Sequence, residues 1–261
     1  MVLETANERR VNNVPPTARP NAQVASNLWP QLAHLATSAA NIDDLMEWFI
    51  TWTHQTAGTA EVVYSSERFY LDFGKVFHDD SFYSARTSYF FDYLIFERRL
   101  SSQSLLASEG STPYQFLRGQ LQAQPDALPQ LIHERVLGLG EFRHSLFQIL
   151  KINEKSMLLQ DLLAATKITV QAKPMETFRG LEKKTILQAF VFPLSGINQL
   201  SSGIVLHPQK ANRLIKRCIK KARASDDFNA KSLLSRLATV QIRYLRHRHV
   251  SPKLIYQVIK D

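Results

Sequence analysis

The sequence predicts an α+β protein in which an aromatic-rich helical part precedes a small antiparallel β part and a basic helical tail. Apolar residues recur at helical spacing within residues 27–143, and five short β-prone runs follow within residues 144–206. Helical spacing returns in residues 207–261, together with a concentration of Lys and Arg. Residues 1–26 show no periodicity and little apolar content, so we expect a disordered arm there.

The helical part is expected to begin with a short helix over residues 30–40 and a stronger one over residues 42–54. Asn41 or Asp43 can cap the second helix, and acidic residues in its first turn suit the positive end of the helix dipole. Thr112 is another cap candidate, because a proline follows it at the first helical position. The later helices are expected over residues 86–100, 113–122 and 126–143.

The β part begins where the spacing of the apolar residues changes. The first run contains Leu146, Ile149 and Ile152, and residues 153–155 form a predicted turn. The other runs cover residues 157–163, 168–172, 186–192 and 197–206. Short strands separated by Gly, Pro, Asn and charged turns favour a strongly bent, five-stranded antiparallel sheet or barrel.

Positive charge is concentrated in the tail. Residues 207–261 contain 14 Lys and Arg against 3 Asp, a net of +11, and the whole chain carries +9, so residues 1–206 carry −2. Such a concentration is typical of a surface that meets nucleic acid, an anionic membrane or an acidic protein, and it equally suits a solvated face.

The tail is expected to form three helices, over residues 209–223, from residue 226 or 227 to 248, and from residue 252 onward. In the first, apolar residues occupy one arc and cations the opposite arc. The apolar stripes, which include Leu254, Ile255, Val258 and Ile259 in the last helix, should pack on the rest of the protein. The candidate anion-binding residues are Lys210, Arg213, Lys216, Arg217, Lys220, Lys221, Arg223, Arg243, Arg246 and Arg248.

Motifs for catalysis or cofactor binding are absent from the sequence. It has no G-x-S-x-G elbow, no Walker loop and no G-x-G-x-x-G. His78-Asp79-Asp80 is the most suggestive metal-ligand cluster, although three adjacent side chains cannot readily face one ion. Asp92 lies among aromatic residues, where a raised pKa would suit an acid, and Glu97 has Arg98 as a candidate ion-pair partner. We expect a non-enzymatic protein without a cofactor or metal.

The leading hypothesis is a binding protein that contacts nucleic acid phosphates through its basic tail, independently of base sequence. The alternative is a protein-interaction or scaffold module with an acidic protein partner. Membrane-surface binding is less favoured, because the apolar arc of residues 209–223 lacks Trp and Phe. The single cysteine, the polar start of the chain and the short apolar runs are typical of a cytoplasmic protein without a transmembrane segment.

Parts of residues 65–207 resemble a pattern found in uncharacterised bacterial proteins, some of which carry a C-terminal zinc motif of the SEC-C type. The resemblance implies an aromatic helix before a small β domain, and it implies no activity. The SEC-C motif is absent here, because the chain has one cysteine. The resemblance rests on Tyr-Phe-Phe-Asp-Tyr-Leu-Ile-Phe-Glu-Arg-Arg-Leu at residues 89–100, Ser-Thr-Pro at 111–113, His-Ser-Leu-Phe-Gln-Ile at 144–149 and Leu-Gln-Asp-Leu-Leu at 159–163.

Overall fold

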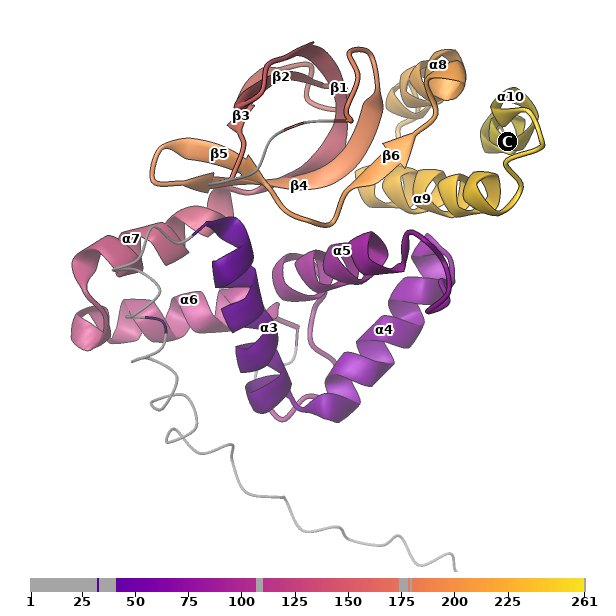
Figure 1. Ribbon diagram of the computed structural model, residues 1–261. Coiled ribbons are helices and arrows are strands. Elements are labelled where there is room, and N and C mark those ends of the chain that lie inside the picture. Colours follow the sequence, from indigo (N-terminus) through magenta and orange to yellow (C-terminus); the bar gives the residue numbers. More distant parts are fainter. Residues whose placement is uncertain (1–31, 33–40, 107–109, 174–177, 179, 261) are drawn as a thin grey trace, which may run out of the picture.

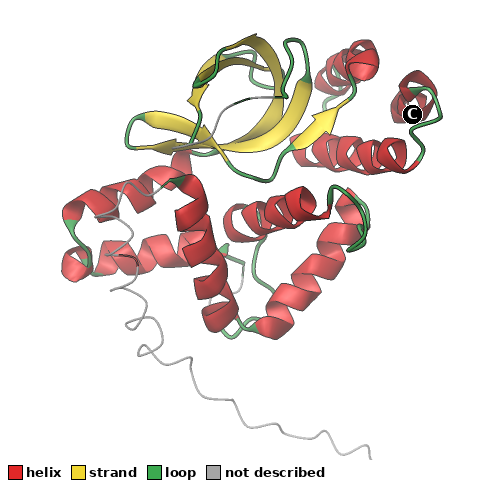
Figure 2. Ribbon diagram, viewed as in Figure 1, coloured by secondary structure: helices red, strands yellow, loops and turns green. Residues whose placement is uncertain are grey.

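The computed structural model describes residues 32, 41–106, 110–173, 178 and 180–260. The arm expected over residues 1–26 lies outside this part, and so does the helix expected over residues 30–40, apart from the buried, helical Leu32. The described elements confirm the α+β fold class: helices precede and follow a strongly curved sheet (Figure 1, Figure 2).

Among the residues described from 41 onward, five α-helices precede the sheet. Asn41 caps the first of them through its side-chain oxygen, which accepts hydrogen bonds from the backbone N–H groups of Asp43 and Asp44. Thr112 accepts from the N–H of Gln115 in the same way. Both predicted caps are confirmed, since capping depends only on neighbouring residues. The helices are α3 (Ile42–Ala57), α4 (Thr59–Phe73), α5 (Tyr83–Phe96), α6 (Pro113–Ala123) and α7 (Gln130–Gly138).

Two predictions for this part were wrong or incomplete. The helix expected over residues 126–143 is reduced to α7, because Pro129 occupies its N-cap and a 3-10 turn (Leu139–Glu141) follows its last residue. Helix α4 was not predicted. Its buried positions include Glu61 and Ser65 as well as three apolar residues, so its apolar spacing is broken.

The strands form a partly open barrel. Strands β1 to β5 follow one another around it in the order β1-β2-β3-β5-β4, and β1 pairs again with β4 to complete the ring. The pairings are antiparallel except between β3 and β5, which meet through one parallel pair, Gln171 with Gln199. The small antiparallel sheet is therefore confirmed. The strands are β1 (Arg143–Ile152), β2 (Ser156–Asp161), β3 (Lys167–Gln171), β4 (Ile186–Leu194), β5 (Ile197–Leu200) and β6 (Val205–His207).

The run expected over residues 197–206 is divided into β5 and β6. Between them the chain passes directly over α5, where Gly203 lies against the backbone of Tyr89. A Cβ at residue 203 would come within 2.5 Å of the Cα of Tyr89 and of Oδ2 of Asp92. This close approach explains both the break in the strand and the glycine.

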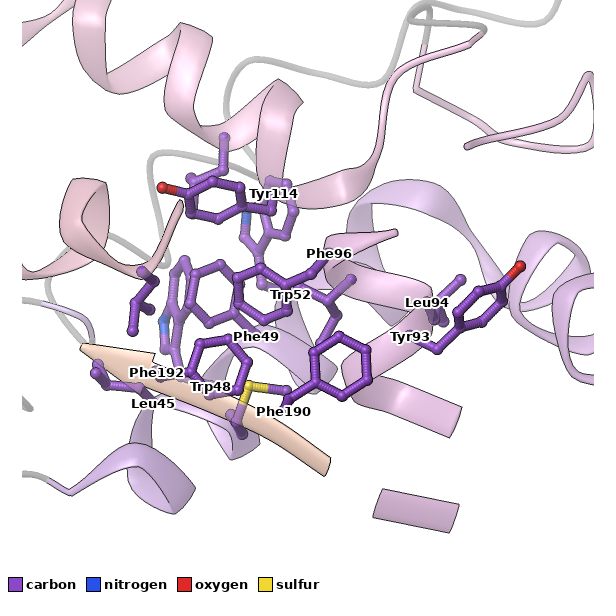
Figure 3. Packing of buried hydrophobic residues seen from close by; sticks show 14 of the residues in the cluster. Leu45, Trp48, Phe49, Trp52, Tyr93, Leu94, Phe96, Tyr114, Phe190 and Phe192 are labelled. Atoms are coloured by element: carbon purple, nitrogen blue, oxygen red, sulfur yellow. The ribbon is translucent and has the colours of Figure 1, made fainter. Parts of the chain in front are cut away.

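One hydrophobic core joins the helical part to the barrel (Figure 3). The ring of Phe96 in α5 lies with its centre 5.8 Å from that of Phe49 in α3 and 4.7 Å from that of Phe192 in β4. Trp48 and Trp52 stack on each other in the same cluster, with ring centres 6.0 Å apart. The aromatic residues that dominate the sequence thus hold helices and sheet together.

Three helices follow the sheet: α8 (Asn212–Arg223), α9 (Ala230–Arg246) and α10 (Pro252–Tyr256). Helix α9 packs on α4, β1 and β6, so it lies between the barrel and the first helices (Figure 1). The expected stripe on the last helix was wrong at two positions, because Leu254 is 60% and Val258 is 53% exposed. Ile255 and Tyr256 are the residues buried there. None of the described helices combines the length and apolar character needed to span a bilayer.

Candidate nucleic-acid interface

Helix α8 presents a continuous cationic face because its few apolar side chains are used to attach it to the protein. Ile215 and Ile219 are buried in a cluster with Leu146 and Ile186 of the barrel. All the cations of α8 are consequently exposed. They are Arg213, Lys216, Arg217, Lys220, Lys221 and Arg223.

Three of these cations line one groove between α8 and the turn after β2. The groove has a volume of about 240 Å³ and is lined by Lys216, Lys220 and Arg223 together with Leu162 and Ile219. The first and third cations are separated by about 10 Å along the helix at 1.5 Å per residue. We call this feature the cationic groove. Every polar side chain that lines it carries a positive charge.

Hydrogen bonds fix the position of the groove relative to the barrel. Nζ of Lys216 donates to Oε1 of Gln148 on β1, at 2.7 Å. The carbonyl of Lys184 accepts from Nδ2 of Asn212 in α8, at 2.7 Å, and from Nε2 of Gln148, at 3.2 Å. The loop before β4 is therefore held against the start of α8.

That loop adds two exposed cations, Lys183 and Lys184, which the sequence analysis did not include among the candidate residues. The only sequence signal was the charged Glu182-Lys183-Lys184 turn between two strand candidates. Its proximity to α8 depends on the fold, since 28 residues separate Lys184 from Asn212.

The opposite side of α8 faces α9. There Lys221 and Arg236 line a hollow of about 220 Å³ with Phe228 and Cys218. Cys218 is half-buried, and burial raises the pKa of its thiol, so the group stays protonated near neutral pH. This supports a packing role for the cysteine.

The remaining candidate cations lie away from the cationic groove. Lys210 is exposed in the 3-10 turn (Gln209–Ala211) before α8, and Arg243 and Arg248 are exposed near the end of α9. Arg246 forms an ion pair with Asp80 at 2.6 Å and lies over the ring of Phe77. It therefore fastens α9 to the segment after α4.

The His78-Asp79-Asp80 cluster forms a turn, and its Asp80 is the ion-pair partner of Arg246. The pKa of Asp80 is lowered, chiefly by its hydrogen bond from Arg246. The ring of His78 packs against Tyr83, with centres 4.4 Å apart. Within the part of the chain that the structure describes, no three His, Cys, Asp or Glu side chains are grouped to hold a metal ion.

Asp92 in α5 and Glu97 just after it have carboxylates with different surroundings. Asp92 is 2% exposed, and burial raises its pKa to about 7. The carboxylate of Glu97, just after α5, accepts from Nδ1 of His144 on β1 at 2.9 Å. The guanidinium of Arg98 lies instead over the ring of Tyr64, so the expected pairing of Glu97 with Arg98 was wrong.

Comparison of the chain with models of protein families, with curated proteins and with solved structures gave no match.

Proposed function

We propose that the protein is a non-enzymatic binding protein that contacts nucleic acid phosphates through the cationic groove. The observation that carries this proposal is the alignment of Lys216, Lys220 and Arg223 in one groove that has no carboxylate among its described lining residues. A strand of nucleic acid presents a phosphate about every 3.4 Å along the duplex axis, so a row of cations about 10 Å long meets two or three phosphates.

The composition of the sheet favours binding through phosphate contacts and not through stacking on bases. The aromatic side chains of the described strands are Phe147, Phe190 and Phe192, and all three are fully buried. Proteins that bind single strands by stacking use exposed aromatic residues on such a surface. Binding through the groove should therefore depend little on base sequence and strongly on salt.

The test compares two variants that lose the same charge. The groove variant is Lys216→Gln/Lys220→Gln/Arg223→Gln, and the control variant is Arg118→Gln/Lys75→Gln/Lys253→Gln, whose residues are also exposed and lie outside the groove. Affinity for a generic 20-base-pair duplex and for a single strand of the same length is measured by fluorescence anisotropy from about 50 to 200 mM salt.

We expect the groove variant to lose most of its affinity and the slope of log affinity against log salt to fall by about 2 to 3, since each phosphate contact contributes about 0.9. The control variant should keep nearly the whole slope. Equal loss in the two variants, binding that is insensitive to salt, or no binding at about 50 mM salt would contradict the proposal. Selective retention of an acidic protein by the groove, with no nucleic acid bound, would do the same.

A further inference from the structure

A second surface of the molecule has the opposite charge. A cleft of about 550 Å³ lies between α3 and α5, closed at one end by Ser202 from the segment between β5 and β6. Its size is within the range of about 300 to 1,000 Å³ that small-molecule sites occupy. Met46, Ile50 and Phe91 give it an apolar wall.

Among the described residues, the charged groups that line the cleft are all acidic: Asp43 and Glu47 from α3 and Asp92 from α5. The charge of Asp43 is balanced by Lys173, whose Nζ donates to it and to the hydroxyl of Ser202. Glu47 at the rim is exposed. In a chain with a net charge of +9, the cleft is thus a local site of negative charge.

Asp92 at the floor of the cleft distinguishes it from an ordinary acidic surface. The side chain is 2% exposed, and its Oδ2 has no hydrogen-bond partner among the described residues. Burying an ionised carboxylate is costly unless hydrogen bonds and a close cation compensate for the lost water. Its pKa is raised to about 7, first by burial and further by Asp43, while Ser201 and Lys173 oppose the rise. A cation that binds in the cleft would therefore stabilise the ionised form of Asp92.

We propose that the cleft between α3 and α5 binds a primary amine with an apolar body, whose ammonium group is attracted by Asp92 and Glu47. The apolar body contacts Met46, Ile50 and Phe91, and the surrounding hydroxyl groups offer acceptors for the remaining ammonium protons. Carboxylate and phosphate ligands are excluded by charge. A bound ammonium lowers the pKa of Asp92, because a nearby positive charge favours the ionised form of the carboxyl group.

The binding test uses three pairs of probes that differ only in charge: butylamine with butanol, 2-phenylethylamine with 2-phenylethanol, and hexylamine with hexanol. Thermal shift and calorimetry are carried out on the full chain at pH 8 and pH 5.5. The titratable groups that face Asp92 are Asp43 and Glu47 on α3, Tyr83 on α5 and Lys173 after β3. The pKa of Asp92, about 7, lies between the two conditions, so this side chain changes its protonation from one to the other.

At pH 8 we expect at least one amine to bind about tenfold or more tightly than its alcohol, and to lose about tenfold in affinity at pH 5.5, where Asp92 is protonated. Asp92→Asn should remove both the preference for the amine and its pH dependence. The isosteric amide resembles the neutral acid, so this variant should fold. The control is Glu67→Gln, which removes an exposed carboxylate of α4. This variant should bind the probes as the unmodified protein does.

A variant that changes only the shape of the cleft tests its role separately from that of the charge. Ser88→Met places a longer side chain in the lining of the cleft and should weaken the binding of amines and of alcohols alike. The proposal is overturned if no amine binds, if the amine and the alcohol bind equally, if Asp92→Asn retains the preference, or if divalent cations but not amines raise the melting temperature. Nucleic acid binding should be the same for Asp92→Asn and the unmodified protein, so the two proposals fail independently.

Discussion

The hydroxyl of Tyr89 lies 2.5 Å from Nε2 of His144, at the junction of α5 with the barrel. Nε2 of Gln188 donates a hydrogen bond to the same hydroxyl. The hydroxyl therefore uses its own hydrogen to donate to the imidazole. Because Nε2 accepts this hydrogen bond, the N–H of the neutral His144 ring is at Nδ1, which donates to Glu97. This chain of four side chains connects a fully buried residue of α5 with two strands and ends at a partly exposed carboxylate.

Tyr89→Phe should destabilise the protein by about 1 to 3 kcal/mol. It leaves Nε2 of His144 and the amide of Gln188 without a partner inside the core, where unsatisfied polar groups are costly. The free energy of unfolding, measured in urea, gives the effect. Tyr64→Phe is the control: its hydroxyl is on the surface near Arg68, so a change within about 0.5 kcal/mol is expected. Equal effects would argue against a buried network.

Two buried groups should give the stability an unusual response to pH. In the folded protein the pKa of Asp92 is raised from 3.8 to about 7 and that of His207 is lowered from 6.5 to about 3, both chiefly by burial. The folded state holds the Asp92 proton more tightly, so this contribution to stability is full below pH 4 and is lost as the pH rises to about 7. For His207 the unfolded state binds the proton more tightly, so its contribution is full above pH 6.5 and is lost as the pH falls toward 3.

The two contributions, each about 4 to 5 kcal/mol, oppose each other between about pH 4 and 6.5. Asp92→Asn should therefore reveal a free energy of unfolding that increases with pH across this range. His207→Gln should reveal one that decreases with pH. Urea titrations at pH 4.5, 5.5 and 6.5 measure both trends. Parallel curves for the two variants would show that these residues do not set the response.

Gly203→Ala should be strongly destabilising, by about 2 kcal/mol or more, because the new methyl group would meet the backbone N and Cα of Tyr89 at 2.6 and 2.5 Å. Gly119→Ala is the matched substitution. This exposed glycine lies inside α6 and has no heavy atom within 4 Å of the added Cβ, so alanine should stabilise the helix by about 0.5 to 1 kcal/mol. Melting temperatures that move in the same direction would contradict the close approach at residue 203.

Local signals in the sequence predicted local structure well. The caps at Asn41 and Thr112 depend on neighbours within three residues, and the first four strand runs are short β-prone segments bounded by turn residues. Helix α4 was missed because the burial of Glu61 depends on a distant segment: its carboxylate accepts a hydrogen bond from the hydroxyl of Ser101, 40 residues away. No periodicity of apolar residues contains that information.

The candidate site could be predicted only as a list of cations. The amphipathic pattern of α8 indicated which side would be exposed, and all ten candidate residues are exposed in the structure. The sequence could not show which of them act together. Arg246 is paired with Asp80, 166 residues away, and Lys216 is joined to the barrel through Gln148, 68 residues away. Both contacts depend on tertiary structure.

The position of α9 between the first helices and the barrel has a consequence for how the chain is made. Arg86 of α5 donates hydrogen bonds to the carbonyl of Ala238 and to Gln241, and Ser235 donates to the carbonyl of Asp72 in α4, at separations of 152, 155 and 163 residues. At about 5 to 20 residues per second, a ribosome needs about 8 to 30 s to add such a length. During this interval α4 and α5 are already synthesised but lack their last packing partner. The nascent chain is then most open to aggregation, and chaperones that bind apolar segments should act on it there.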